Sequence, residues 1–165
     1  MAVGTVSGLN LDEEWQLIAS GSPTASSSSY SFTSISGYKT LMIAFKKIVT
    51  SVDCNFYARF NGDSTNHNYD GHFNGYDVTG YYSTTGMPLT AYVGGASNGN
   101  SGYTIIKYAN STSMFKIASE GVSYVSNNNK SIWMNNTDAI SSIAIYTTTG
   151  TFTGSGTFYL YGIPA

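Results

Sequence analysis

Apolar residues occur in short runs along the chain, and no run longer than a few residues keeps the 3.6-residue repeat of a helix. The clearest run is 55–60, in which Phe56, Ala58 and Phe60 alternate with residues of the opposite face. Ser, Thr, Gly and Asn fill the gaps between runs and mark turns. Eight or more short strands of this kind predict an all-β protein, a single jelly-roll-like antiparallel β-sandwich.

The runs also divide the chain. Residues 1–29 are expected to form an extended N-terminal arm and a Ser-rich loop, and residues 30–165 the sandwich domain. A helix is conceivable over 11–18, but an extended strand or arm fits the alternation there better. The segment 61–99 is rich in Gly and Tyr and is expected to be a long loop region, with only short runs such as 81–82 and 89–93 that could pair. Strands are predicted at 41–46, 55–60, 103–109, 114–118, 122–125, 132–134, 140–146 and 157–163.

Charge and cysteine content exclude several functions. The net charge is −2 and Arg59 is the only arginine, which argues against nucleic-acid binding, because such binding needs clustered cations. There is no secretion signal and no membrane-length apolar stretch, so synthesis in the cytoplasm is expected, with no membrane partner. The single cysteine, Cys54, cannot form an internal disulfide and is interpreted as a small core residue.

The segment 66–77 places oxygen-bearing side chains at alternate positions before a glycine. Laid on the calcium-loop pattern, Asn66, Asn68 and Asp70 take positions 1, 3 and 5, and Asp77 takes position 12. The first position is not Asp and the last is the shorter acid, so this is a weak calcium candidate. Turns built from Asn, Asp and Gly explain the same residues.

Catalysis is not indicated. His67 and His72 lack the converging ligands of a zinc site, and the only cysteine lies upstream of both. No nucleophile motif, phosphate loop or metalloprotease motif is present. A hydrolase with paired acids among Asp63, Asp70 and Asp77 is a weaker alternative, because glycosidase carboxylates need a cleft that this sequence does not indicate. The chain is therefore predicted to be no enzyme and to need no cofactor.

Aromatic residues supply the candidate binding surfaces. Five aromatic residues of the polar region could stack on sugars or pack on a partner, or else cover the open end of the sandwich: Tyr69, Phe73, Tyr76, Tyr81 and Tyr82.

The last sixteen residues raise a separate question. A strand at the end of a chain normally lies at a sheet edge, yet here both faces are bulky. Phe158 and Leu160 are assigned to the core. The opposite residues would pack on the flank of the second sheet or on a neighbouring subunit, with Gly150 to Gly156 as a flexible hairpin. The predicted interface residues are Trp15, Trp133, Tyr146, Tyr159, Tyr161 and Ile163.

Three landmarks of the sequence carry a family resemblance. The run Ile140, Ile143, Ile145, Gly150, Phe152, Gly154 and Leu160 to Ile163 resembles the closing strand pair of small β-sandwich modules in tailed-bacteriophage virion proteins. The segment Arg59 to Asp63 is similar to an Arg-Phe-Asn-Gly-Asp stretch of the same modules, and Trp15 before a Ser-rich turn fits them too. The resemblance implies a structural role without catalysis, in homotrimers or other symmetric arrays.

Two functions follow as expectations. The first is a decoration or cement protein on the virion surface that stabilises the capsid shell through contacts with the major capsid protein. The second is a receptor-binding tip or accessory protein of the tail, whose Tyr-rich region binds a host-surface glycan. The early start of the sandwich favours the capsid, because tail fibres usually carry a stalk or docking domain first.

Overall fold

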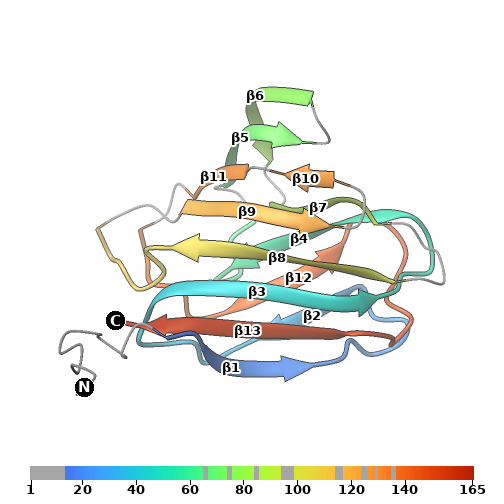
Figure 1. Ribbon diagram of the computed structural model, residues 1–165, viewed down its shortest axis with the longest axis horizontal. Coiled ribbons are helices and arrows are strands. Elements are labelled where there is room, and N and C mark those ends of the chain that lie inside the picture. The colour runs from blue at the N-terminus through green and yellow to red at the C-terminus, as the bar shows by residue number, and fades with distance from the viewer. Residues whose placement is uncertain are drawn as a thin grey trace, which may run out of the picture.

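The computed structural model describes residues 14–64, 67–73, 76–83, 86–93, 99–113, 117–123, 126–128, 130–134 and 137–165. Side chains are described over 14–64, 99–113 and 137–165 and at Leu89, and burial is also described for Gly86. Throughout these ranges the regular elements are strands (Figure 1). The described part of the chain contains no helix with the length and hydropathy that a membrane span requires.

The strands of the described ranges, in chain order, are β1 (Gln16–Gly21), β2 (Ser29–Phe32), β3 (Tyr38–Ile48), β4 (Cys54–Phe60), β5 (His67–Phe73), β6 (Tyr76–Ser83), β7 (Met87–Val93), β8 (Asn100–Lys107), β9 (Ile117–Ser123), β10 (Ser126–Asn128), β11 (Lys130–Met134), β12 (Ile143–Thr147) and β13 (Thr157–Pro164).

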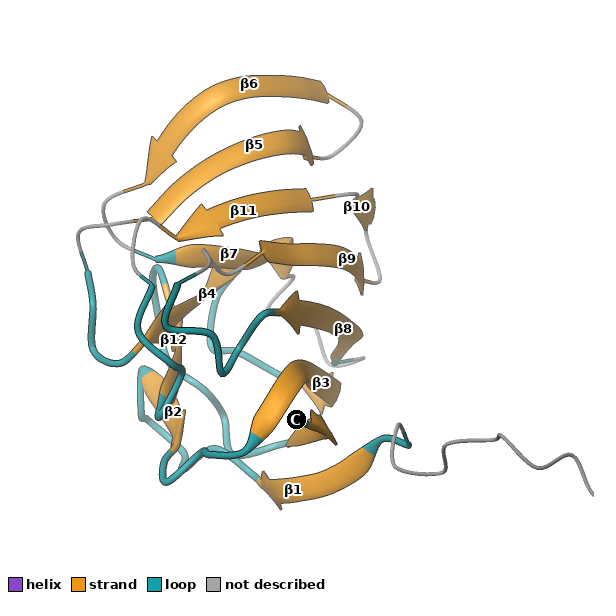
Figure 2. Cartoon of the chain, turned by 90° about the vertical axis from the view of Figure 1, so that its left-hand side faces the viewer, coloured by secondary structure: helices purple, strands orange, loops and turns teal. Residues whose placement is uncertain are grey.

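The strands form two antiparallel sheets. The first sheet has the order β1-β13-β3-β8-β9-β11-β5-β6, with β10 paired to β9, and the second has the order β2-β12-β4-β7. Seen from the side, the two sheets face each other, and β11, β5 and β6 curve over the end of the second sheet at β7 (Figure 2). The predicted all-β sandwich is therefore confirmed.

The core lies between the sheets, where the alternating residues of each strand point inward. Phe56, Ala58 and Phe60 of β4 are at most 1% exposed, as their alternation predicted. The Phe56 ring meets the rings of Phe45 and Phe158 from the first sheet, with centroids 5.9 and 6.2 Å apart. Edge-to-face contacts of this kind add to the burial of apolar area that holds the two sheets together.

The C-terminal strand β13 is not an edge strand. It pairs with β1 on one side and with β3 on the other, so its backbone groups are satisfied along both sides. The edge next to it is β1, whose register shifts between Leu17 and Ala19. A bulge in an edge strand disfavours pairing with another chain. The edge problem posed by the terminal strand is thus solved within the chain.

The segment between β12 and β13 is not the predicted hairpin, because the two strands belong to different sheets. It crosses the open end of the sandwich, and Gly150, Gly154 and Gly156 take φ values of 66°, 87° and 84° along it. Such angles strain any residue with a Cβ. The glycines therefore turn the chain across the sandwich rather than loosening it.

Phe152 closes that end of the core. Its side chain is 1% exposed, and its ring centroid lies 5.6 Å from those of both Phe56 and Phe158. Its amide donates to the Ser27 carbonyl at 2.8 Å, and its carbonyl accepts from the Ser26 amide at 2.9 Å. The Ser-rich loop is therefore tied to the core through the backbone of one phenylalanine.

The structure adds strands to two regions. Gln16–Gly21, part of the segment expected to be an extended strand or arm, forms β1 within the first sheet, so strand pairing begins before residue 30. The region 61–99 contains β5, β6 and β7; the short runs 81–82 and 89–93 that were expected to pair lie in β6 and β7, whereas β5 was not predicted. Hydrogen bonding between neighbouring strands overrides the weak local preference of their Gly, Asn and Asp residues. Residues 1–13 lie outside the described part of the chain.

We expect Phe152→Ala to lower the free energy of unfolding by about 3–5 kcal/mol, because it leaves a cavity beside the buried rings of Phe56 and Phe158. Phe152→Leu should cost less, since it keeps part of the volume. Urea denaturation of the parent and both variants measures the difference. Equal stability of the alanine variant and the parent would show that this crossing segment does not close the core.

Candidate functional site: the outer face of the first sheet

Strand β13 has bulky residues on both of its faces. Phe158 and Leu160 are fully buried, whereas Tyr159, Tyr161 and Ile163 are half-buried on the opposite face. The rings of Tyr159 and Tyr161 stack, with centroids 6.2 Å apart and an angle of 21° between their planes. The two rings therefore support each other on the outside of the sandwich.

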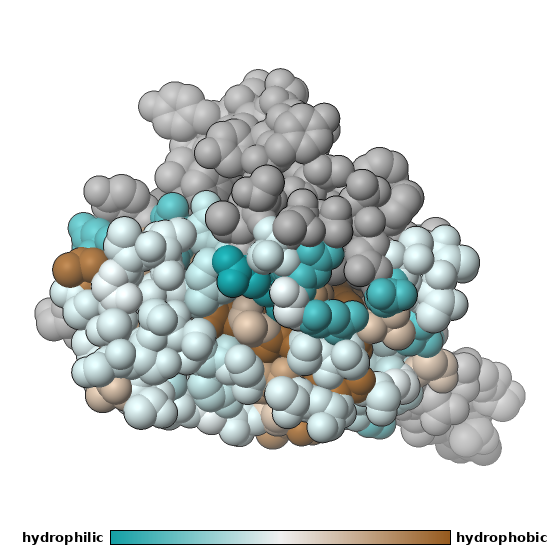
Figure 3. Space-filling model, turned by 180° about the vertical axis from the view of Figure 1, so that it is seen from behind, coloured by the Kyte–Doolittle hydropathy of each residue, from teal (hydrophilic) through white to brown (hydrophobic). Residues whose placement is uncertain are grey.

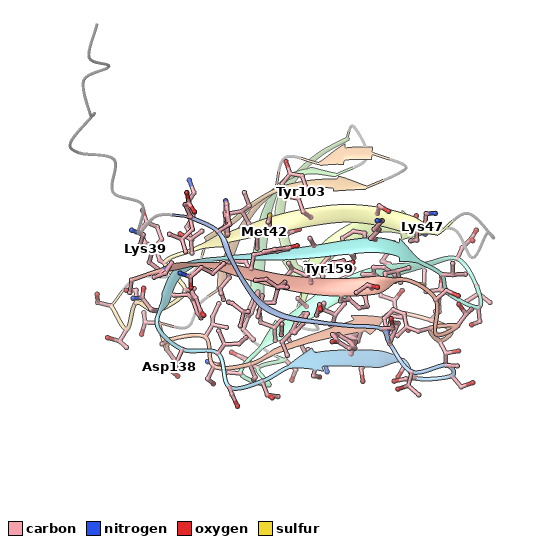
Figure 4. The ribbon with its side chains drawn as sticks, turned by 60° about the horizontal axis from the view of Figure 1, so that its bottom comes forward. Lys39, Met42, Lys47, Tyr103, Asp138 and Tyr159 are labelled. Atoms are coloured by element: carbon pink, nitrogen blue, oxygen red, sulfur yellow. The ribbon has the colours of Figure 1, made fainter. Side chains whose placement is uncertain are left out.

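The neighbouring strands extend this apolar character. On β3, Met42 and Ala44 alternate with buried residues and are half-buried on the outside. On β8, Tyr103 and Ile105 do the same. Met42, Tyr103 and Tyr159 thus come from three adjacent strands of the first sheet (Figure 4).

The bulge in β1 adds a fourth strand to the surface. Because the register shifts between Leu17 and Ala19, both Leu17 and Ser20 are exposed, while Ile18 and Ala19 pack against the core. Leu17 is 56% exposed. An apolar side chain on an edge strand beside two tyrosines widens the surface toward the edge of the sheet.

We call these residues the apolar outer face. Its members are Leu17, Met42, Ala44, Tyr103, Ile105, Tyr159, Tyr161 and Ile163.

No member of the apolar outer face carries a charge. Lys46 of β3 and Lys107 of β8 lie at its opposite ends, where they pair with Thr157 and Thr40. Contiguous uncharged apolar and aromatic surface of this kind marks a site of protein association more often than an accident of exposure.

The outer face of the second sheet has a different character. There the Arg59 guanidinium lies 4.3 Å from the centroid of the Tyr146 ring, and Tyr57 packs beside the same ring at 5.8 Å. Ser29 and Ser31 of β2 are exposed. Seen from behind, the part of this side that is not grey is mostly pale, with brown apolar patches near its middle (Figure 3). The outer face of the second sheet therefore carries the charge of Arg59 among its residues, whereas the members of the apolar outer face carry none.

The predicted interface residues divide accordingly. Tyr159, Tyr161 and Ile163 lie together on the apolar outer face. Trp15 is 39% exposed and directly precedes β1. Tyr146 lies on the second sheet, away from the other three, and contacts Arg59. For Trp133 the structure describes only the backbone, on β11.

Sequence reasoning missed the other members of the face, which lie on β1, β3 and β8. The signal was present in the run Leu41 to Phe45, where both alternating sets are apolar. A strand inside a sheet that faces solvent should have one polar face. Two apolar faces on several adjacent strands thus pointed to a covered or associating surface.

The Tyr-rich region forms the β5–β6 hairpin. The register pairs Tyr69 with Tyr81 and Phe73 with Tyr76, and it places Asn68 opposite Tyr82. Aromatic positions thus occupy neighbouring places on two strands at the far end of the first sheet from β1. The side chains of the five candidates lie outside the described residues, so their glycan or partner role stays a prediction.

The residues of the calcium-loop candidate that the structure describes form strands and not a loop. Asn68 and Asp70 lie on β5, Asp77 lies on β6 opposite His72, and Asn66 is outside the described residues. A calcium loop winds around its ion, whereas these strands are extended. Among the residues whose side chains the structure describes, no three His, Cys, Asp or Glu side chains come together as a metal site.

Cys54 is a core residue, as predicted. It is 6% exposed, and burial raises the pKa of its thiol. Nearby Asp53 raises the pKa as well, while a hydrogen bond with Thr50 opposes the shift. A thiol kept neutral by burial is a poor nucleophile at neutral pH.

The Arg-Phe-Asn-Gly-Asp segment has a structural role that its sequence did not indicate. Asn61 has a φ of 52°, and its side-chain oxygen accepts from the amides of Ser141 and Ser142 at 2.8 and 3.2 Å. The same oxygen accepts from the Ser141 hydroxyl at 3.0 Å, and the Asn61 amide group donates to the Ala139 carbonyl at 2.9 Å. Asn61 therefore fixes the segment that leads into β12.

Comparison with known proteins finds no matching family model, no matching curated protein and no matching solved structure. The function is therefore argued from the residues and from the geometry described above.

We expect Asn61→Gly to lower the free energy of unfolding by about 1–2 kcal/mol, since it removes four exposed hydrogen bonds but tolerates the positive φ. Asn61→Ala should cost about 1 kcal/mol more, because alanine disfavours that backbone angle. Equilibrium denaturation measures both. A glycine variant as stable as the parent would show that the side-chain bonds contribute nothing.

Proposed function

We propose that the chain is a non-enzymatic structural protein of a tailed-phage virion, located on the capsid surface, where it stabilises the shell as a decoration protein. The observation that carries the proposal is the apolar outer face, an uncharged surface on one side of the sandwich only. Apolar area buried at a joint between subunits contributes about 25 cal/mol per Å² before the costs of association are subtracted. The family resemblance of the sequence supplies the virion context.

The strand order supports the jelly-roll part of the proposal. The strands β1, β2, β3, β4, β7, β8, β12 and β13 make up the two facing four-stranded units. Numbered one to eight in chain order, they read 1-8-3-6 in the first sheet and 2-7-4-5 in the second. Eight strands that pass between two sheets in this way are those of two interlocked Greek keys. The remaining strands are insertions between β4 and β7 and between β8 and β12.

A receptor-binding tip of the tail is the second candidate. The observation that favours it is the register of the β5–β6 hairpin, which pairs aromatic positions at the end of the sheet away from the apolar outer face. A protein that docks through one end and presents aromatic residues at the other could hold a host glycan by ring stacking.

Virions assembled with the Tyr161→Asp variant should not incorporate it, because a carboxylate in the middle of the apolar outer face opposes burial of that face against another subunit of the particle. Tyr146→Asp is the matched control, with the same substitution on the outer face of the second sheet, and should be incorporated normally. Stained gels of purified virions give the copy number, and circular dichroism verifies that both variants fold.

A parent copy number in the hundreds fits a capsid protein, and a handful would instead place the protein on the tail. Absence of the parent protein from purified virions would contradict both assignments.

The tail alternative predicts glycan binding through the hairpin. A glycan array probed with the parent protein should then show binding, and Tyr81→Ala with Tyr82→Ala should reduce it by about tenfold or more, as expected when stacked rings are removed. The Tyr161→Asp variant should bind as the parent does. An array on which the parent binds nothing removes this candidate.

A further inference from the structure

We propose that the apolar outer face binds a second copy of this chain, face to face, about a two-fold axis that runs along the strands midway between β13 and β3. The inference rests on the apolar outer face being the interaction surface of the proposed function, and it names the partner. Stacked sheets pack about 10 Å apart with their strands within about 30° of parallel, which this arrangement allows.

Under this symmetry, the outward side chains of one copy fit in size against the outward side chains of the second copy. One row crosses β1, β13, β3 and β8 at Ser20, Tyr159, Ala44 and Tyr103. Small and large side chains therefore alternate along it. The axis places β13 over the partner's β3 and β1 over the partner's β8. Tyr159 then lies over the partner's Ala44, and Tyr103 over the partner's Ser20.

The next row is apolar throughout. It runs through Leu17, Tyr161, Met42 and Ile105 on the same four strands. The same axis sets Tyr161 over the partner's Met42 and Leu17 over the partner's Ile105. Both are contacts between apolar side chains, so this row needs no small residue to accommodate its partner. In a two-fold contact of this kind, each residue pair occurs twice, once from each copy.

The charges also avoid each other. Lys46 pairs in register with Thr157, so the axis places it over the partner's Thr157 and not over the partner's Lys46. A sugar chain is a poorer occupant of this surface, because sugars need several hydrogen-bonding groups and the two rows offer only hydroxyls. A second copy fits both the size pattern and the absence of charge.

The area predicts a weak contact. Four strands about 4.8 Å apart and eight residues at about 3.3 Å each give the four-stranded face a projected area of roughly 500 Å² per copy. About 1,000 Å² in total is at the low end of specific interfaces, for which we expect a Kd of roughly 1–100 μM. Such a contact forms at high local concentration, as in an ordered array on a particle.

Sedimentation equilibrium of the purified full chain, from about 1 μM to about 1 mM, tests the proposal against the expected Kd. The parent should show a monomer–dimer equilibrium. Ala44→Glu should weaken it by about 100-fold or more, because it buries an unpaired charge. Ala44→Leu should weaken it by about tenfold, because a larger side chain occupies the space of the partner's Tyr159.

Ala144 provides the matched control. It is a half-buried alanine on the outer face of the second sheet, between Ser31 and Arg59 in register. Ala144→Glu and Ala144→Leu should leave the dimer unchanged. Thermal unfolding of all four variants verifies that they fold.

Several outcomes would overturn the two-fold contact. The first is a monomer at every concentration, and the second is a trimer of the kind that the resemblance implies. The third is stronger dimerisation of Ala44→Leu, because nonspecific apolar association increases with apolar area. Each of them leaves incorporation into virions open. Absence from virions overturns the proposed function but leaves the dimer intact.

Discussion

Hydrogen bonding along both sides of β13 is the constraint on which the rest of the structure depends. Because β13 lies between β1 and β3, its two faces are fixed toward the core and toward the outside. Phe158 and Leu160 are fully buried on the inner face, and the ring of Phe158 joins the aromatic cluster that holds the sheets together. The outer residues then have no further layer within the described part of the sandwich. The surface that we assign to a partner is a consequence of this placement.

Glycine residues make the placement possible at two points. The crossing segment before β13 needs positive φ at Gly150, Gly154 and Gly156. Within β13, Gly162 occupies an inward position, and a Cβ there would lie 2.7 Å from Cγ of Tyr38 and 2.8 Å from Cδ1 of Ile18. The missing side chain lets Tyr38 and Ile18 pack over the strand, so the core is closed at this end by residues from outside β13.

Sequence periodicity predicted the sandwich and most of its central strands because inward residues there are strongly apolar, as in Phe56, Ala58 and Phe60. It did not predict β5 or most of β6, where Gly, Asn and Asp read as turns although β5 pairs with β11 and β6 pairs with β5. It predicted strands at β12 and β13 but wrongly joined them as a hairpin, because alternation does not say which sheet a strand joins. Of the candidate surface, only the part on β13 was identified. The neighbours that complete it come from strands far apart in sequence.

The central claim is that the apolar outer face is covered by protein in the working state of the molecule. Hydroxyl-radical footprinting with mass spectrometry measures this directly, by comparing the oxidation of Tyr159 and Tyr161 in dilute protein and in assembled material. Tyr57 and Tyr146 on the second sheet serve as internal references. Strong protection of the first pair with little change in the second is the predicted result. Equal oxidation of Tyr159 and Tyr161 in both states would contradict the account.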